Sequence, residues 1–276
     1  MVILDKTDYG KVVEPFKKVT INNLFARAVI KQTVSGKIFV DDKSYPKTFY
    51  VVHPYGMTLL FGESTNEKFN EAFKRYALNK DNARSSFEWM QAFPGDWDNV
   101  LPSLFKGVLV KSTANKEKVE KGLIELNTRV NFKFNFAKHQ PLSSQVVDKD
   151  ISIVRANGQM FRDMQGSVVP KYFWDDEEDF LKNGVAFALF YKDELASMSF
   201  SSYWFDNDFE IGIETKEKFR GKGLAELVCR AIIDYCIENN YEPIWSCRLE
   251  NVGSCKLAQK LGYEPTLYLP YYRLSN

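Results

Sequence analysis

The stretch Phe209-Glu-Ile-Gly-Ile-Glu-Thr-Lys-Glu-Lys-Phe-Arg-Gly-Lys-Gly-Leu-Ala225 predicts a strand, a short loop and the first turn of a helix. From Leu224 to Glu238 apolar residues recur at three- and four-residue spacing, which is typical of a helix that packs on a sheet. The segment Arg220–Ala225 places small residues where the strand turns into the helix. Several backbone N–H groups at the helix start therefore point at an anion without side chains in the way. A pyrophosphate fits such a turn, and Arg220 and Lys222 add positive charge beside it.

Other phosphate-binding and metal-binding motifs are absent from the sequence. There is no G-x-G-x-x-G, and no Gly-Lys pair is followed by Ser or Thr. The chain has only two histidines, His53 and His139, and its four cysteines show no C-x-x-C spacing. We therefore expect no metal site, and we expect the cysteines to be reduced thiols, most of them in the core.

Composition excludes further classes of protein. The 37 basic and 36 acidic residues give a formal net charge of +1, so the electrostatic footprint of a nucleic-acid binder is missing. The apolar fraction of 45% suits a globular protein. The N-terminus has no signal-peptide pattern, and apolar runs such as Val185–Tyr191 are far shorter than the ~20 residues of a membrane helix. We expect a cytoplasmic protein with no membrane partner and no nucleic-acid partner.

Two similar series of elements follow one another along the 276 residues. From Gly36 to Gly62 three short segments rich in β-branched and aromatic residues, each typical of a strand, are separated by turn signals. A helical pattern follows over Asn66–Leu78. The second half repeats this order with strands over Val185–Tyr191, Leu195–Tyr203 and Phe209–Thr215 before its helix. Compact domains cluster at ~100 to 150 residues, so the repeat predicts two domains of similar layout.

We divide the chain into residues 1–138 and residues 139–276, with a linker over 139–150. The first domain carries further helical patterns around 9–25 and at 117–126, and the second carries a helix that ends in the acidic run 174–180. After Gly62 the chain gives Glu-Ser-Thr-Asn-Glu, which places two carboxylates where an anion would lie. We therefore expect the first domain to be a scaffold without a cofactor site that can also form one wall of the acceptor cleft.

Arg220, Gly223 and Ala225 match the pattern Arg/Gln-x-x-Gly-x-Gly/Ala, and on these residues the sequence resembles the GNAT acetyltransferases. Downstream, Asp234–Asn251 and Lys260-Leu-Gly-Tyr263 are similar to the fifth strand and the closing turn of that family, in details closest to the group around zwittermicin A resistance proteins. The close match covers about Phe209 to Tyr263, and a looser one extends from about residue 145 to the C-terminus. The resemblance implies an α/β (α+β) fold with a mixed, mostly antiparallel sheet flanked by helices, and a similar, degenerate layout for the N-terminal half.

The resemblance also implies an acetyl-CoA site. Backbone amides of the loop would hold the pyrophosphate, and the strand end before the loop would pair with the pantetheine arm as an added strand does. A later asparagine would hydrogen-bond that arm, and a serine would lie near the thioester; both residue types are also favoured at helix N-caps. The implied residues are Ile213, Glu214, Thr215, Arg220, Gly221, Lys222, Gly223, Leu224, Ala225, Asn251 and Ser254.

Two positions bear on catalysis. Ala258 stands where many family members have a tyrosine that protonates the departing thiolate, so either Ser254 or water protonates the sulfur, or the thiolate leaves unassisted. A primary amine is mostly protonated at neutral pH and needs a base or a water relay. Glu214 and Glu210 share one face of the predicted strand, and Glu214 is our candidate base because it is nearer the loop.

The leading hypothesis is transfer of an acetyl group from acetyl-CoA to a primary amine of a small molecule or peptide, by direct attack in a ternary complex. One alternative is a non-catalytic acyl-CoA-binding module, which the alanine at position 258 favours. Another is an aminoacyl-tRNA-dependent transferase, against which the near-neutral charge and the intact loop argue. The acceptor pocket has no fixed motif, so the sequence specifies neither the acceptor nor the oligomeric state.

Overall fold

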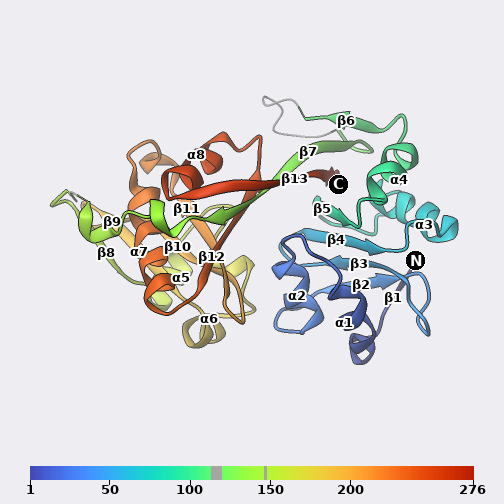
Figure 1. Cartoon of the computed structure of the whole chain (residues 1–276), viewed down its shortest axis with the longest axis horizontal. Helices are drawn as coiled ribbons and strands as arrows, with labels where there is room; N and C mark the ends of the chain where they lie inside the picture. The colour runs from blue at the N-terminus through green and yellow to red at the C-terminus, as the bar shows by residue number, and fades with distance from the viewer. Residues whose placement is uncertain (113–119, 146–147) are drawn as a thin grey trace. The chain divides into compact units, whose positions relative to one another are not determined.

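The computed structural model describes residues 1–112, 120–145 and 148–276, and the chain divides into two compact units (Figure 1). Unit 1 comprises Met1–Val130, Arg248–Asn251 and Leu267–Asn276, and unit 2 comprises Asn131–Cys247 and Val252–Thr266. In both units the strands are mostly antiparallel and helices pack against them, which confirms the predicted fold class.

Unit 1 begins with two helices that precede a meander of three antiparallel strands. The next helix leads to a strand, β5, that runs parallel to β4, so the element order matches the one predicted for Gly36–Leu78. The elements are β1 (Val2–Ile3), α1 (Gly10–Phe16), α2 (Leu24–Ile30), β2 (Lys37–Val40), β3 (Thr48–Val52), β4 (Met57–Gly62), α3 (Glu67–Ala77), β5 (Glu88–Phe93), α4 (Trp97–Leu104), β6 (Leu109–Lys111) and β7 (Ile124–Phe134).

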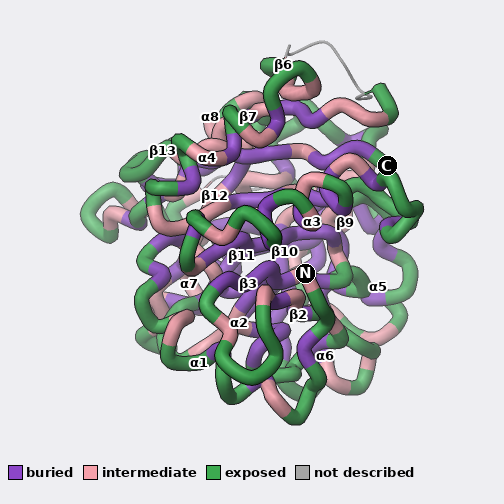
Figure 2. The backbone as a smooth tube through the Cα atoms, turned by 90° about the vertical axis from the view of Figure 1, so that its right-hand side faces the viewer, coloured by how far each residue is buried: buried purple, intermediate pink, exposed green. Residues whose placement is uncertain are grey.

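Alternation along β3 and β4 gives unit 1 an apolar layer on each face of its sheet. Tyr50 and Leu60 belong to the buried cluster that includes α3 and α4 residues such as Phe73. Their neighbours Phe49 and Phe61 point to the other face of the sheet and stack at 4.7 Å between ring centroids. Phe61 also contacts Phe16 of α1 on that face. Figure 2 shows the consequence, with buried backbone along the strands and exposed backbone at the turns. The sheet is therefore buried by helices on both sides.

The last residues of the chain complete unit 1. Strand β13 (Tyr263–Leu274) pairs antiparallel with β5, with Tyr272 opposite Met90. Arg84 is 6% exposed and donates to the carbonyls of Ala77 at 2.8 Å and Leu274 at 3.2 Å, so it joins the end of α3 to the end of β13. The sequence-based division at 138/139 assumed two contiguous halves. The compact units differ from it because their boundaries fall inside β7 and β13, and periodicity does not tell which sheet a strand joins.

Unit 2 repeats the series of unit 1. Strands β8 to β11 are antiparallel to their neighbours, and helix α7 packs on β9, β10 and β11 before the parallel strand β12. The elements are β8 (Ile151–Arg155), α5 (Gly158–Asp163), α6 (Glu177–Asn183), β9 (Ala186–Tyr191), β10 (Glu194–Phe205), β11 (Asp208–Thr215), α7 (Leu224–Glu238), β12 (Glu242–Arg248), α8 (Val252–Lys260) and the first part of β13.

Local predictions failed where polar side chains or distant strands decide the structure. The pattern at 9–25 contains helix α1, which ends at Phe16, and only the first two residues of α2; Asn22 and Asn23 hydrogen-bond to nearby backbone just before α2 begins. Residues 117–119 of the predicted helix at 117–126 lie outside the described residues, and its end is strand β7 rather than helix.

The acidic run starts a helix instead of ending one. Asp176 caps α6 by accepting a hydrogen bond from the backbone N–H of Asp179, and carboxylates suit the positive end of a helix. The described part of the predicted linker is held in place, since Asp234 of α7 accepts from the backbone N–H of Leu142 at 2.9 Å and lies 2.6 Å from His139. Val146 and Val147 lie outside the described residues.

In the part of the chain that the structure describes, no helix has the length and apolar character needed to cross a membrane.

We expect Arg84→Ala to lower the free energy of unfolding by about 3 kcal/mol, because it leaves several buried carbonyls without a donor. Arg75→Ala is the matched control. Its ion pair with Asp81 is exposed, so its loss should change stability by less than about 1 kcal/mol. Chemical denaturation of both variants measures the difference, and equal stability of the two would contradict the structural role of Arg84.

Candidate functional site

The loop between β11 and α7 is held out at the surface by a buried residue on each side. Phe219 and Leu224 are 8% and 2% exposed and pack in one apolar cluster with residues of β9, β10 and α7. The four residues between them, Arg220–Gly223, are all exposed. Two buried anchors with an exposed turn between them thus fix where α7 begins.

The glycines of this loop leave the start of α7 bare. Gly221 and Gly223 have φ angles of +80° and +76°, a region that side chains disfavour, and a Cβ atom at either position would meet nothing within 4 Å. Gly223 is the N-cap of α7 and supplies no side-chain cap. Among the described residues, none accepts a hydrogen bond from the backbone N–H groups of Gly221–Ala225. The predicted row of unpaired amides is therefore present.

The corresponding helix of unit 1 lacks this feature. Asn66 is the N-cap of α3, and its side-chain oxygen accepts from the backbone N–H of Phe69 at 3.1 Å. Asn70 reaches back to the carbonyl of Ser64, which ties down the preceding turn. The amino end of α3 is thus satisfied by its own side chains.

The parallel strand pairs of the two units also differ. In unit 1, β4 and β5 are in register over five positions, from Met57–Trp89 to Phe61–Phe93. In unit 2, the register of β11 with β12 covers only Asp208–Glu210 against Glu242–Ile244. Strand β11 continues from Ile211 to Thr215 beyond that register. An extended ligand segment can pair with such a strand edge.

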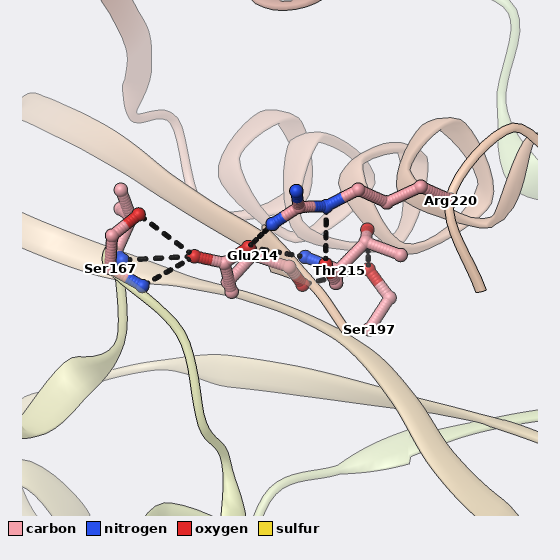
Figure 3. Close-up of polar contacts among 6 residues, drawn as sticks. Ser167, Ser197, Glu214, Thr215 and Arg220 are labelled. Carbon is pink, nitrogen blue, oxygen red and sulfur yellow. Dashed lines mark hydrogen bonds and ion pairs between the residues drawn. The ribbon is translucent and has the colours of Figure 1, made fainter. Parts of the chain in front are cut away.

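Glu214, the candidate base, is enclosed by donors (Figure 3). It is 6% exposed, and one carboxylate oxygen accepts from the backbone N–H of Ser167 at 2.8 Å, from the Ser167 hydroxyl at 3.3 Å and from the backbone N–H of Val168 at 3.0 Å. The other oxygen accepts from the backbone N–H of Thr215 at 3.2 Å and from Arg220 at 3.1 Å. A carboxylate offers about four lone-pair positions, so five donors leave none for a substrate proton.

The two loop cations take different directions. Arg220 donates from Nε to the carbonyl of Thr215 at 3.1 Å and from Nη2 to Glu214, while its side chain stays 60% exposed. Lys222 lies with Nζ 5.6 Å from the ring centroid of Tyr191. Arg220 is thus oriented along the end of β11, whereas the charge of Lys222 lies over β9.

Thr215 is the least available part of the predicted pantetheine edge. Its N–H donates to Glu214 and its carbonyl accepts from Arg220. Its side-chain oxygen lies 2.7 Å from that of Ser197. The edge predicted at Ile213–Thr215 is therefore engaged within the protein at its last residue.

Ser254 and Asn251 follow β12. Ser254 lies in α8 and its hydroxyl accepts from the indole N–H of Trp245 at 3.3 Å, which holds it against β12. Asn251 precedes α8 and belongs to unit 1, whereas the loop and Ser254 belong to unit 2. Ala258 is fully buried in α8 and offers no hydroxyl.

The cysteines are free thiols. Cys229 and Cys236 are fully buried on α7, and burial raises the pKa of the Cys229 thiol to about 12. The sulfur of Cys247 lies 3.5 Å from that of Cys255 on α8. Within the described ranges, no group of three His, Cys, Asp or Glu side chains is placed to hold a metal ion.

Sequence reasoning missed the partner segment of Glu214. Gly166, Ser167 and Val168 lie between α5 and α6, and Ser167 and Val168 contact Glu214 across a sequence separation of 46 or 47 positions. A Gly-Ser pair in a polar loop is too common a pattern to have indicated this contact.

Three comparisons with known proteins agree. The family model described as GNAT acetyltransferase matches residues 14–272. The chain is 27% identical over 250 residues to the uncharacterized N-acetyltransferase YdfB of Bacillus subtilis (strain 168), which covers 90% of this chain and 89% of the relative.

Two solved structures share the fold. A GCN5-related N-acetyltransferase-like protein from Streptococcus suis aligns with a TM-score of 0.70 at 18% identity, covering 96% of this chain and 98% of that one. A tandem GNAT protein from the clavulanic acid biosynthesis pathway aligns with a TM-score of 0.61 at 9% identity, covering 99% of this chain and 97% of that one. The likeness extends over both units, so the duplicated layout is shared with these structures.

Proposed function

The chain belongs to the GNAT acetyltransferase family, and we propose that it transfers the acetyl group of acetyl-CoA to a primary amine by direct attack in a ternary complex. The observation that carries the proposal is the row of unpaired backbone amides at Gly221–Ala225, held at the surface beside a strand edge that β12 does not cover. Unit 1 has a capped helix and a fully registered strand pair at the same positions, so we assign one cofactor site per chain, in unit 2.

The residues present fit acetyl-CoA. The amides of Gly221–Ala225 would bind the pyrophosphate, because a helix start with bare N–H groups favours a doubly charged anion. The edge of β11 at Ile213 and Glu214 would pair with the pantetheine arm. Bound acetyl-CoA supplies the thioester whose carbonyl carbon the amine attacks.

Proton transfer sets the remaining requirements. The acceptor ammonium must lose a proton before attack, and the engaged carboxylate of Glu214 is badly placed to take it. We assign this step to water or to Glu210, whose carboxylate accepts from Ser246 at 2.9 Å. Ser254 is the hydroxyl we propose near the departing sulfur, since Ala258 has no proton to give.

Several finer points stay predictions. These are the zwittermicin A resistance-like subgroup, independence from metal ions and nucleic acid, and a cytoplasmic location. The acyl-CoA-binding module is the second candidate function, because Ala258 removes the usual general acid.

A panel of aminoglycosides, polyamines, amino acids and peptides with acetyl-CoA, read by mass spectrometry and by thiol release, tests the function. Acetylated acceptor and stoichiometric free thiol support an acetyltransferase. Acetyl-CoA binding without thiol release for any amine would favour the binding module instead.

Gly223→Leu should raise the dissociation constant of acetyl-CoA at least ~10-fold, because the side chain would occupy the space in front of the amides. Gly107→Leu is the matched control, since Gly107 has a similar φ of +85° and equally open surroundings in unit 1. Calorimetry should show one site per chain in wild type and in the control. Unchanged affinity in Gly223→Leu would remove the pyrophosphate from this loop.

Arg220→Glu should also weaken acetyl-CoA binding ~10-fold by reversing the charge beside the loop, and the loss should shrink at high salt. Lys182→Glu, an exposed charge reversal on α6, is the control for net charge. The same calorimetric titrations at two salt concentrations measure it, and a salt-independent loss would indicate local misfolding.

Ser254→Ala should lower kcat about tenfold with little change in acetyl-CoA affinity. Thiols have a pKa near ~8.5, so the thiolate needs no proton above that pH and the loss should shrink there. Steady-state kinetics between pH 6.5 and 9.5 measure the ratio to wild type. A loss that does not vary with pH would argue against Ser254 as the acid.

A further inference from the structure

We propose that Glu214 is a positioning residue that ties the segment Gly166–Val168 to the end of β11 and holds the Arg220 guanidinium beside the loop that precedes α7. This inference rests on the proposed function, because it assigns Arg220 to the cofactor. It replaces the general-base role that the sequence suggested for Glu214.

The contacts come from three parts of unit 2. Ser167 and Val168 donate from the segment between α5 and α6, Thr215 donates from the end of β11, and Arg220 donates from the loop. Each carboxylate oxygen therefore has its own set of partners, one facing the segment and one facing the loop (Figure 3). A single side chain thus links two loops that no backbone hydrogen bond joins in the described residues.

Gly166 shows how closely the segment approaches. A Cβ atom built at Gly166 would lie 2.3 Å from Cγ and 2.4 Å from Oε2 of Glu214, with a φ angle of +150° at the glycine. Real Cβ atoms are not found at such distances, so only glycine permits this approach. The segment and the carboxylate are therefore shaped to each other.

Burial explains why the side chain at position 214 has to be a carboxylate. A charged group that is 6% exposed is stable only with partners for its charge and lone pairs, and here backbone N–H groups and a guanidinium supply them. A glutamine keeps one acceptor oxygen and replaces the other with an NH2 donor. It therefore cannot receive both the Ser167–Val168 amides and Arg220.

Hydrogen exchange of the whole protein tests the contacts of Glu214 with Ser167 and Val168 without an activity measurement. In Glu214→Gln the backbone amides of Ser167 and Val168 should exchange at least ~10-fold faster than in wild type. Gly166→Ala breaks the same contact from the other side and should give the same increase with the carboxylate intact. Glu217→Gln removes an exposed charge three residues away and should leave both rates unchanged.

Kinetics separate positioning from base catalysis. A positioning role predicts that Glu214→Gln and Gly166→Ala raise the KM for acetyl-CoA about tenfold while kcat stays within about threefold of wild type. The ratio to wild type should be flat from pH 6.5 to 9.5. A general base predicts instead a ~10²- to 10⁴-fold loss of kcat at constant KM, which shrinks as pH rises toward the pKa of the amine.

The outcomes can be told apart. Unchanged exchange at Ser167 and Val168 in Glu214→Gln would overturn the proposal, and so would the pH-dependent loss of kcat. If Glu214→Gln fails to fold, as judged by thermal unfolding, Gly166→Ala carries both measurements. A wild-type protein that binds no acetyl-CoA would refute the proposed function and the assignment of Arg220 to the cofactor, while the exchange rates still decide whether Glu214 holds the segment.

Discussion

The unpaired backbone amides at the start of α7 are the constraint that organises unit 2. Helix starts leave N–H groups without intrahelical partners, and burying them without an acceptor is costly. The chain keeps them in solvent by exposing Arg220–Gly223 and burying Phe219 and Leu224 on either side. Because Gly223 provides no side-chain cap, these amides stay accessible to an acceptor from outside the chain. The absence of a side-chain cap at the start of α7 is therefore what makes a cofactor site feasible in unit 2.

Unit 1 shows how the same fold closes such a site. Asn66 supplies the missing acceptor from within the chain, and β4 and β5 remain in register over five positions. Both changes increase local pairing of the backbone, and both remove room for a ligand. In unit 1 buried polar side chains instead bind the backbone of the unit itself, as Arg84 does when it donates to the carbonyl of Leu274 at the end of β13. Two units of one layout thus differ in whether backbone groups are satisfied by the protein itself.

Local chemistry made the loop and its helix predictable from sequence. Glycines at Gly221 and Gly223 and the apolar spacing after Leu224 depend only on near neighbours, so the sequence alone predicts them. The helical pattern at 117–126 failed at its end because Ile124 and its neighbours pair with β6 through contacts that periodicity does not record. The same limit applies to β13, whose alternation predicts a strand but not that its last residues would pair with β5.

Glu214 illustrates why a residue type in the right place does not determine a role. Alternation along β11 correctly puts a carboxylate next to the loop, and a carboxylate near an amine site is the usual reason to infer a base. A base needs a lone pair that faces the substrate, and that depends on what surrounds each oxygen. Here three of the five donors come from Ser167 and Val168, 46 or 47 positions earlier in the chain, which no local pattern connects to β11. Once those donors are counted, the same carboxylate serves geometry rather than proton transfer, and the loop charge of Arg220 becomes dependent on a contact made on the opposite side of Glu214.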